Sequence, residues 1–167
     1  MASKKINFPF RIGHGYDIHR VKSGGKLILA GVKVAQGISP IAHSDGDVIL
    51  HAVVDALLGA IGAGDIGELF PNSDPRWKNA ASKVFVQKAL QEVRKMGFQV
   101  ANLDVTILAE SPKLKQFKPL MKKTLSTLVG GLVNIKAGTN EQCDAIGRGE
   151  AIAAHAVVLL AANNNAK

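Results

Sequence analysis

Apolar and polar residues alternate in several short runs of the chain, the spacing typical of β-strands. Such runs predict four strands, up to about Val21 and over residues 26–34, 98–109 and 132–138. The turn-like sequence KSGG, residues 22–25, separates the first two. The stretch AIAAHAVVLLAA, residues 151–162, fits either a buried strand or an alanine-rich helix, and its composition alone does not decide between them.

Elsewhere apolar residues recur every three or four positions, which gives a helix one apolar face. This spacing predicts three helices, from about Asp47 to about Ile61, from Ser82 to just before Gly97, and over about residues 115–129. Ser82 has the side chain of a helix N-cap, and a pair of glycines at residues 130–131 ends the third helix. Residues 62–75 predict a loop that has room for one short helical turn.

Strands mixed with helices place the chain in the α+β class. We expect a two-layer sandwich, in which a mixed four-stranded sheet carries helices on one face. A length of 167 residues suits one domain with a real core, so we predict a single domain over residues 1–167. Residues 1–10 are expected to form a flexible N-terminal extension.

The composition argues against several classes of protein. A single cysteine, Cys143, allows no intrachain disulfide and no cysteine-based zinc site, which suits a reducing compartment. No apolar run approaches the roughly 18 residues of a transmembrane helix, and the first ten residues lack the apolar core of a secretory signal. The net charge of +8 fits a solvated basic surface or an anionic ligand. Scattered lysines without interleaved aromatic residues argue against nucleic acid.

Candidate chemistry begins in the segment RIGHGYDIHR, residues 11–20. Because side chains of a strand alternate between its faces, Asp17 and His19 share one face and His14 points to the other. A carboxylate oxygen and an imidazole nitrogen on one face can provide two ligands to a divalent ion. Ordinary polar residues on a strand are the alternative, and His14 is expected to be structural.

The predicted helix in AHSDGDVILHAVVDALLG carries a polar stripe. Asp47, His51 and Asp55 are spaced four residues apart and lie at the border of the apolar face. His51 is therefore either a core histidine with satisfied hydrogen bonds or a third ligand beside Asp17 and His19. In the second case the set would hold a zinc ion with one open position.

Three further segments offer weaker signals. HSDG presents backbone N–H groups to an anion, with His43 and Ser44 at its mouth, or it simply caps the helix. GDIGELFPNSDP suits a loop that binds hydroxyl groups, although turn formation alone explains it. In KAGTNEQCDAIGRGEA, Thr139 can donate to a phosphate, Glu141 can hold a hard cation such as Mg²⁺, and Arg148 can bind a phosphate through its planar guanidinium.

In this order, these segments resemble the family of 2-C-methyl-D-erythritol 2,4-cyclodiphosphate synthases, of the non-mevalonate isoprenoid pathway. The likeness runs from RIGHGYDIH through AHSDGDVILHAVVDALLGA and GDIGELFPNSDP to GRGEAIAAHAV, nearly the whole chain. It implies a homotrimer with sheets facing a central cavity, helices outside and three active sites at the subunit interfaces. It also implies a lyase, in which the 2-phosphate of 4-diphosphocytidyl-2-C-methyl-D-erythritol 2-phosphate attacks the β-phosphorus, releasing CMP and a cyclic diphosphate.

The resemblance also implies roles for individual residues. Asp17, His19 and His51 would be ligands of one Zn²⁺ per subunit, with a phosphate oxygen in the fourth position. Glu141 would hold a second ion, Mg²⁺ or Mn²⁺, on the substrate diphosphate. His43 and Thr139 would be catalytic, as stabilisers of the transition state. The implied substrate-binding residues are Asp17, His19, His43, Ser44, Asp65, Ile66, Gly67, Phe70, Pro71, Asn72, Ser73, Asp74, Ala109, Glu110, Ser111, Pro112, Lys113, Leu114, Lys115, Ala137, Gly138, Thr139, Asn140, Glu141 and Arg148.

Two positions depart from the pattern of this family. Gly138 stands where many members have a threonine, and Ala145 stands where an aromatic residue often closes the pocket or faces the trimer cavity. Because Arg148 is retained, the resemblance still implies a cavity that can bind an isoprenoid diphosphate.

Two other functions remain open at this point. One is a zinc-dependent phosphohydrolase of the same fold, with water as the nucleophile. The other is a module that binds an isoprenoid diphosphate or a nucleotide without turnover, although such a module has little use for an open zinc position. Neither nucleic acid nor a membrane is an expected partner. We expect the bacterial cytoplasm as the location, or a plastid-type organelle if a transit peptide has been removed.

Overall fold

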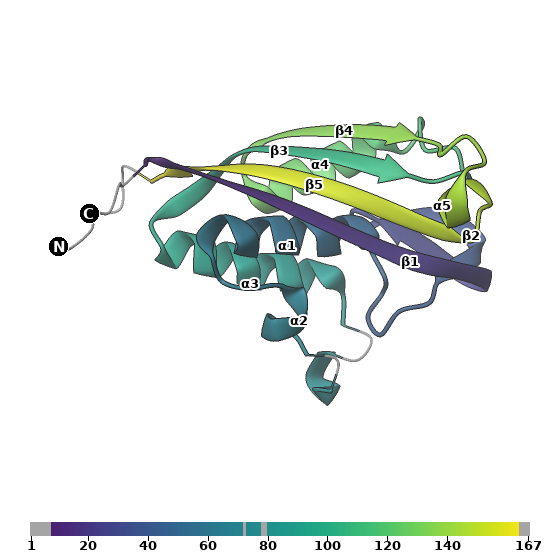
Figure 1. Ribbon diagram of the computed structural model, residues 1–167, viewed down its shortest axis with the longest axis horizontal. Helices are drawn as coiled ribbons and strands as arrows, with labels where there is room; N and C mark the ends of the chain where they lie inside the picture. Colours follow the sequence, from purple (N-terminus) through teal and green to yellow (C-terminus); the bar gives the residue numbers. More distant parts are fainter. Residues whose placement is uncertain (1–7, 72, 78–79, 164–167) are drawn as a thin grey trace.

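The computed structural model of the chain describes residues 8–71, 73–77 and 80–163 (Figure 1). Its strands are β1 (Phe10–Leu29), β2 (Val32–Pro40), β3 (Phe98–Leu108), β4 (Leu132–Gly138) and β5 (Ala151–Ala162). Its helices are α1 (Val48–Ile61), α2 (Ile66–Leu69), the 3-10 helix η1 (Pro75–Trp77), α3 (Ser82–Lys95), α4 (Lys118–Val129) and α5 (Asp144–Gly147). Among these described helices, none has both the length and the apolar character needed to cross a membrane. The predicted flexible extension lies mostly outside the described residues, and its last residue, Phe10, already belongs to β1.

One mixed sheet joins the five strands in the order β2-β1-β5-β3-β4. The β1–β2, β1–β5 and β3–β5 pairs are antiparallel, whereas β3 and β4 run parallel, with α4 in the connection between them. The predicted α+β class and mixed sheet are confirmed. The predicted count of four strands is wrong, because residues 151–162 form β5. Its alanines favour a helix and its isoleucine and valines favour a strand, and its position between β1 and β3 makes it a strand.

The hairpin between β1 and β2 turns at Ala30 and Gly31, both with positive φ, of 51° and 74°. The predicted turn at residues 22–25 is therefore wrong. That segment lies inside β1, where the register of pairing with β2 shifts. Gly24 and Gly25 adopt φ of 87° and 78° there, so they form a bulge in a continuous strand rather than its end.

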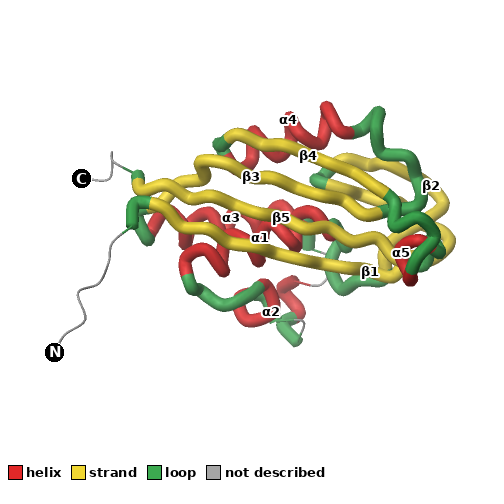
Figure 2. Tube along the Cα trace, turned by 45° about the horizontal axis from the view of Figure 1, so that its top comes forward, coloured by secondary structure: helices red, strands yellow, loops and turns green. Residues whose placement is uncertain are grey.

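Helices α1, α3 and α4 cover one face of the sheet and leave the opposite face open (Figure 2). The side of β5 that faces the helices carries core residues, namely Ile152, Ala154, Ala156, Val158 and Leu160. This is the predicted two-layer arrangement, with helices on one face only.

Two glycines allow the closest contact between the layers. A Cβ atom on Gly13 would lie 1.9 Å from the carbonyl oxygen of Ala56, and one on Gly15 would lie 1.9 Å from that of Ala52. Only glycine, which has no Cβ, lets β1 approach the α1 backbone this closely. The contact brings His51 of α1 over the neighbouring residues of β1.

The starts of the helices differ in detail from the prediction. Asp47 is the N-cap of α1, and its side chain accepts a backbone N–H of the first turn. Helix α3 begins at Ser82, but its N-cap is Ala81, and the Ser82 side chain makes no capping bond. Helix α4 begins at Lys118 instead of near residue 115, with Pro119 in its first turn, where a missing N–H costs nothing.

Candidate metal centre

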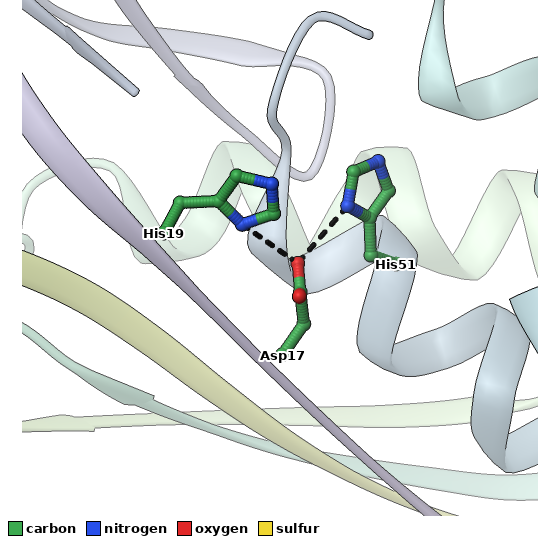
Figure 3. Close-up of side chains that lie close together, drawn as sticks. All are labelled: Asp17, His19 and His51. Carbon is green, nitrogen blue, oxygen red and sulfur yellow. Dashed lines mark hydrogen bonds and ion pairs between the residues drawn. The ribbon is translucent and has the colours of Figure 1, made fainter. Parts of the chain in front are cut away.

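Asp17, His19 and His51 form one cluster where β1 faces α1 (Figure 3). Asp17 Oδ2 lies 2.9 Å from His19 Nδ1 and 3.0 Å from His51 Nδ1. One potential ligand atom from each residue falls within 4.8 Å of the others. His51 is only 8% exposed, and the other two are half-buried. The structure thus brings together three residues from two elements, at the distances that a shared ion requires.

The donor atoms of this cluster fit a metal ion. His19 Nδ1 is buried and, despite its short distance to Asp17, has no hydrogen-bond partner within the described part of the chain. A buried ring nitrogen left without such a partner beside a carboxylate is the arrangement expected of two ligands to one cation. A carboxylate oxygen and two imidazole nitrogens are also ligand types that zinc uses in sites with an open position. The three residues can therefore hold a metal ion.

The carboxylate of Asp17 is charged at neutral pH. Burial by itself raises its pKa, but the adjacent His19 and His51 imidazoles outweigh burial and lower the pKa of Asp17 to about 2. The cluster therefore presents a negative charge in a partly buried place, where a cation is attracted more strongly than in water.

A cavity of about 620 Å³ opens beside the cluster. Eight residues predicted to contact the substrate line it, namely Asp17, His19, His43, Ser44, Ile66, Gly67, Phe70 and Asp74. Asp65, on the same loop, instead caps α2 by accepting the Glu68 N–H at 2.9 Å. Pro71 and Ser73 are exposed and do not line the cavity, and Asn72 lies outside the described residues.

The remaining predicted residues gather at a different place, where β3 and β4 end. The backbone N–H of Ala109, the first residue after β3, donates to the Gly138 carbonyl at 3.1 Å, which joins the two segments. Thr139 donates its hydroxyl proton to Glu141 Oε1 at 2.6 Å. This second group comprises Ala109, Glu110, Ser111, Pro112, Lys113, Leu114, Lys115, Ala137, Gly138, Thr139, Asn140 and Glu141.

Within the described part of one chain, the two groups lie in different places on the sheet. In the sheet, Asp17 pairs with Ala154, Ala154 pairs with Ile107, and Ile107 pairs with Ala137. Asp17 and Ala137 therefore lie three strands apart. At ~4.8 Å per strand this separation is roughly 14 Å. No residue of the second group lines the cavity beside the metal cluster. Arg148 is also outside that lining, and it is paired with Glu150 at 2.9 Å.

Six lining residues are not among the predicted site residues, namely Ile18, Arg20, Ile41, Ala42, Trp77 and Phe85. The rings of Phe70, Trp77 and Phe85 contact one another, with centroids 4.6, 5.2 and 5.8 Å apart. Phe85 reads from the sequence as an ordinary core residue of α3. The only tryptophan of the chain, directly after a proline-rich loop, is the signal that could have indicated an aromatic wall.

The fold and the cluster define an α+β protein in which three residues that could hold a metal ion open onto a cavity. Residues 10–161 match the YgbB family, and the chain belongs to this family. A relative from rice, named 2-C-methyl-D-erythritol 2,4-cyclodiphosphate synthase, chloroplastic, is 47% identical over 162 residues, which cover 95% of this chain and 73% of the relative. A relative with the same enzyme name from Nitrosococcus oceani is 50% identical over 153 residues, which cover 90% of this chain and 97% of the relative.

Solved structures agree with this assignment. The bifunctional IspDF from Campylobacter jejuni matches with a TM-score of 0.89 and 40% identity, over 93% of this chain and 43% of that one. IspF from Plasmodium falciparum, solved as a CDP complex, matches with a TM-score of 0.82 and 34% identity, over 95% of this chain and all of that one. The resemblance to the synthase family in the sequence is confirmed.

Proposed function

We propose that the chain converts 4-diphosphocytidyl-2-C-methyl-D-erythritol 2-phosphate to 2-C-methyl-D-erythritol 2,4-cyclodiphosphate and CMP, the activity after which its relatives are named. The observation that carries this proposal is the Asp17–His19–His51 cluster, which opens onto a cavity large enough for the methylerythritol part of such a substrate. These three residues would hold Zn²⁺, and Glu141 would hold Mg²⁺ or Mn²⁺ on the substrate diphosphate.

The reaction asks the protein mainly to position charged groups. An oxygen of the 2-phosphate bonds to the β-phosphorus, and the bond from that phosphorus to the CMP oxygen breaks. Both reacting groups belong to one molecule, so holding them in line makes the step unimolecular. When bound, the two cations neutralise the negative charge of the approaching phosphates. His43 and Thr139 would donate hydrogen bonds where charge develops, and no general base is needed, because the attacking phosphate is already anionic.

The two separated groups of residues support a site shared between copies of the chain. In our proposal, the metal cluster of one copy meets the β3–β4 end of a neighbour, where residues 109–115 and 137–141 would hold the cytidine diphosphate part. Glu110 Oε2 is buried there without a hydrogen-bond partner within the described residues, so it is free to accept a donor from the ligand. The CDP complex of the Plasmodium falciparum relative supports a cytidine pocket in this family.

The open face of the sheet supports assembly as a homotrimer. Large apolar side chains are exposed on it, led by Ile12 at 71%, together with Phe10, Tyr16, Ile18, Leu132 and Val157. Exposed apolar side chains gathered on one face are typical of a protein interface. Three copies related by a threefold axis would bury these side chains around a central cavity. Arg148 could bind an isoprenoid diphosphate in that cavity if it left Glu150.

The proposal is tested by incubating the protein with the CDP-linked substrate, Zn²⁺ and Mg²⁺, and following the reaction by phosphorus NMR. We expect CMP and the cyclic diphosphate, and no reaction after chelation of the metals. Hydrolysis products in place of the cyclic diphosphate would favour the phosphohydrolase. Binding of the substrate without any CMP would favour the binding module, and either result would overturn the synthase proposal.

The compartment is proposed from the relatives. Plant relatives are named as chloroplastic, and bacterial relatives carry no such label. We propose the bacterial cytoplasm, with a plastid-type organelle as the alternative. Fractionation of the source cells, with antibody detection of the chain, distinguishes the two.

A further inference from the structure

His51 is held from behind by two hydroxyl groups. Its Nδ1 faces Asp17, and its Nε2, on the opposite side of the ring, lies 2.9 Å from Ser82 Oγ and 3.0 Å from Ser44 Oγ. Ser82 is completely buried at the start of α3, although it makes no capping bond. A buried hydroxyl aimed at a metal-binding ring has a more specific use than starting a helix.

Asp45 determines the direction of these hydrogen bonds. Its carboxylate accepts the backbone N–H of Ser82 at 3.0 Å, and its other oxygen accepts the Ser82 hydroxyl proton. A serine hydroxyl has one proton to donate. Since Asp45 takes that proton, Ser82 Oγ can only accept from His51. A proton on Nε2 of His51 satisfies this acceptor, and Ser44 Oγ can accept from the same proton, so in the neutral ring the lone pair lies on Nδ1.

We propose that Asp45 and Ser82 are positioning residues that hold His51 in the tautomer able to bind metal through Nδ1. The inference rests on the metal site of the proposed function. With the proton on Nε2, the Nδ1 lone pair and Asp17 Oδ2, which lie 3.0 Å apart, are both available to one cation. Partners behind a metal-bound imidazole typically change metal affinity by roughly 10- to 100-fold.

The first test compares zinc affinity by competition with a chromophoric chelator. In Asp45→Asn the amide can donate to Ser82 Oγ, so the hydroxyl proton turns toward Nε2 and favours the wrong tautomer of His51. Ser82→Ala removes the acceptor altogether. We expect zinc to bind roughly 10- to 100-fold more weakly in both variants. Ser126→Ala, a half-buried serine of α4 away from the cluster, is the matched control and should bind like the unaltered chain.

The second test reads the tautomer directly in the zinc-free protein, by nitrogen-15 NMR of the His51 ring. The unaltered chain should carry its proton on Nε2, and Asp45→Asn should move it toward Nδ1. A change of helix stability alone would not move this signal. If Ser82→Ala fails to fold, the isosteric Asp45→Asn variant carries the test.

The two proposals fail in different ways. An unaltered chain that binds no zinc would contradict the metal site of the proposed function, while the tautomer comparison would still test Asp45 and Ser82. A zinc-binding chain in which both variants keep the normal affinity, with the His51 proton unmoved in Asp45→Asn, would overturn the role of Asp45 and Ser82.

Discussion

At the scale of single residues, the cluster of Asp17, His19 and His51 is an unfavourable arrangement unless a cation binds to it. A charged carboxylate, a half-buried imidazole and a buried imidazole share a space in which each ligand atom lies within 4.8 Å of the others. Burial makes unpaired electron donors costly, and a cation that all three bind removes this cost. Metal binding should therefore depend on each of the three side chains.

His51→Ala should reduce bound zinc from one ion per chain to almost none, because two remaining ligands hold zinc poorly. Zinc content after gel filtration, measured by atomic emission, gives the result. His14→Ala is the matched control, since His14 lies on the open face of the sheet, with its Nε2 3.1 Å from His155 Nδ1. Unchanged zinc in His51→Ala, or equal loss in the control, would contradict the ligand assignment.

At the scale of elements, the distance between β1 and α1 determines the geometry of the cluster. Two ligands belong to β1 and the third to α1, and the two elements approach closely because Gly13 and Gly15 have no side chains. A change that separates the two elements should therefore weaken metal binding, even where no ligand is altered.

Gly15→Ala tests this dependence. Its Cβ would lie 1.9 Å from the backbone oxygen of Ala52, the residue after His51, so α1 would have to move. We expect a loss of about 1–3 kcal/mol in the free energy of unfolding, together with weaker zinc binding. The control is Gly59→Ala, at an α1 position with open space, which should stabilise the fold by up to ~1 kcal/mol. Urea unfolding and zinc titration measure both effects, and equal behaviour of the two variants would refute the argument.

Asp47 joins the β1–β2 turn to the start of α1. It is fully buried and accepts the backbone N–H groups of Ala30, Gly31 and Leu50 at 2.9, 2.7 and 3.2 Å. Burial outweighs these three donors and raises the pKa of Asp47 from 3.8 to about 6. The folded state thus binds a proton more tightly than the unfolded state does.

Protonation of Asp47 should stabilise the fold fully below pH 4, and this contribution should disappear as the pH rises through 6. The advantage of the unaltered chain over Asp47→Asn in the free energy of unfolding should therefore grow between pH 7 and pH 4, by up to ~3 kcal/mol. Urea unfolding with excess chelator, at pH values across this range, measures it. Both proteins share every other titrating group. If the difference between them in the free energy of unfolding does not change with pH, Asp47 keeps an ordinary pKa.

The alternation of apolar and polar residues, and the helical spacing of apolar residues, were enough to predict most elements and the shared face of Asp17 and His19. They failed where an element is decided by its neighbours. Strand β5 is a strand because of its place between β1 and β3, and the glycines at residues 24–25 serve a bulge that no local pattern distinguishes from a turn. In the sequence, Ser82 has the features of a helix cap. Its contact with Asp45, 37 positions away, forms only after α3 has packed on α1, so no local pattern reveals it.

At the scale of the whole molecule, the chain separates what its chemistry needs to combine. The metal cluster faces the helices on one side of the sheet, and the β3–β4 end with Thr139 and Glu141 lies three strands away. Rigid strands cannot close that distance within one chain. A neighbouring copy can, and the exposed apolar face gives the copies a reason to associate.

Mixed trimers test this shared site directly. His51→Ala damages the metal half of a site and Glu141→Ala the other half, so each variant alone should be inactive. If each site takes its halves from two copies, trimers co-assembled from equal amounts of the two variants should recover about a quarter of normal activity. The reason is that a site between two randomly assembled neighbours has both halves intact in one case out of four. If each site lies within one chain, the mixture should stay inactive. The control co-assembles the unaltered chain with the double variant, which should give about a quarter of full activity for shared sites and about half for sites within one chain.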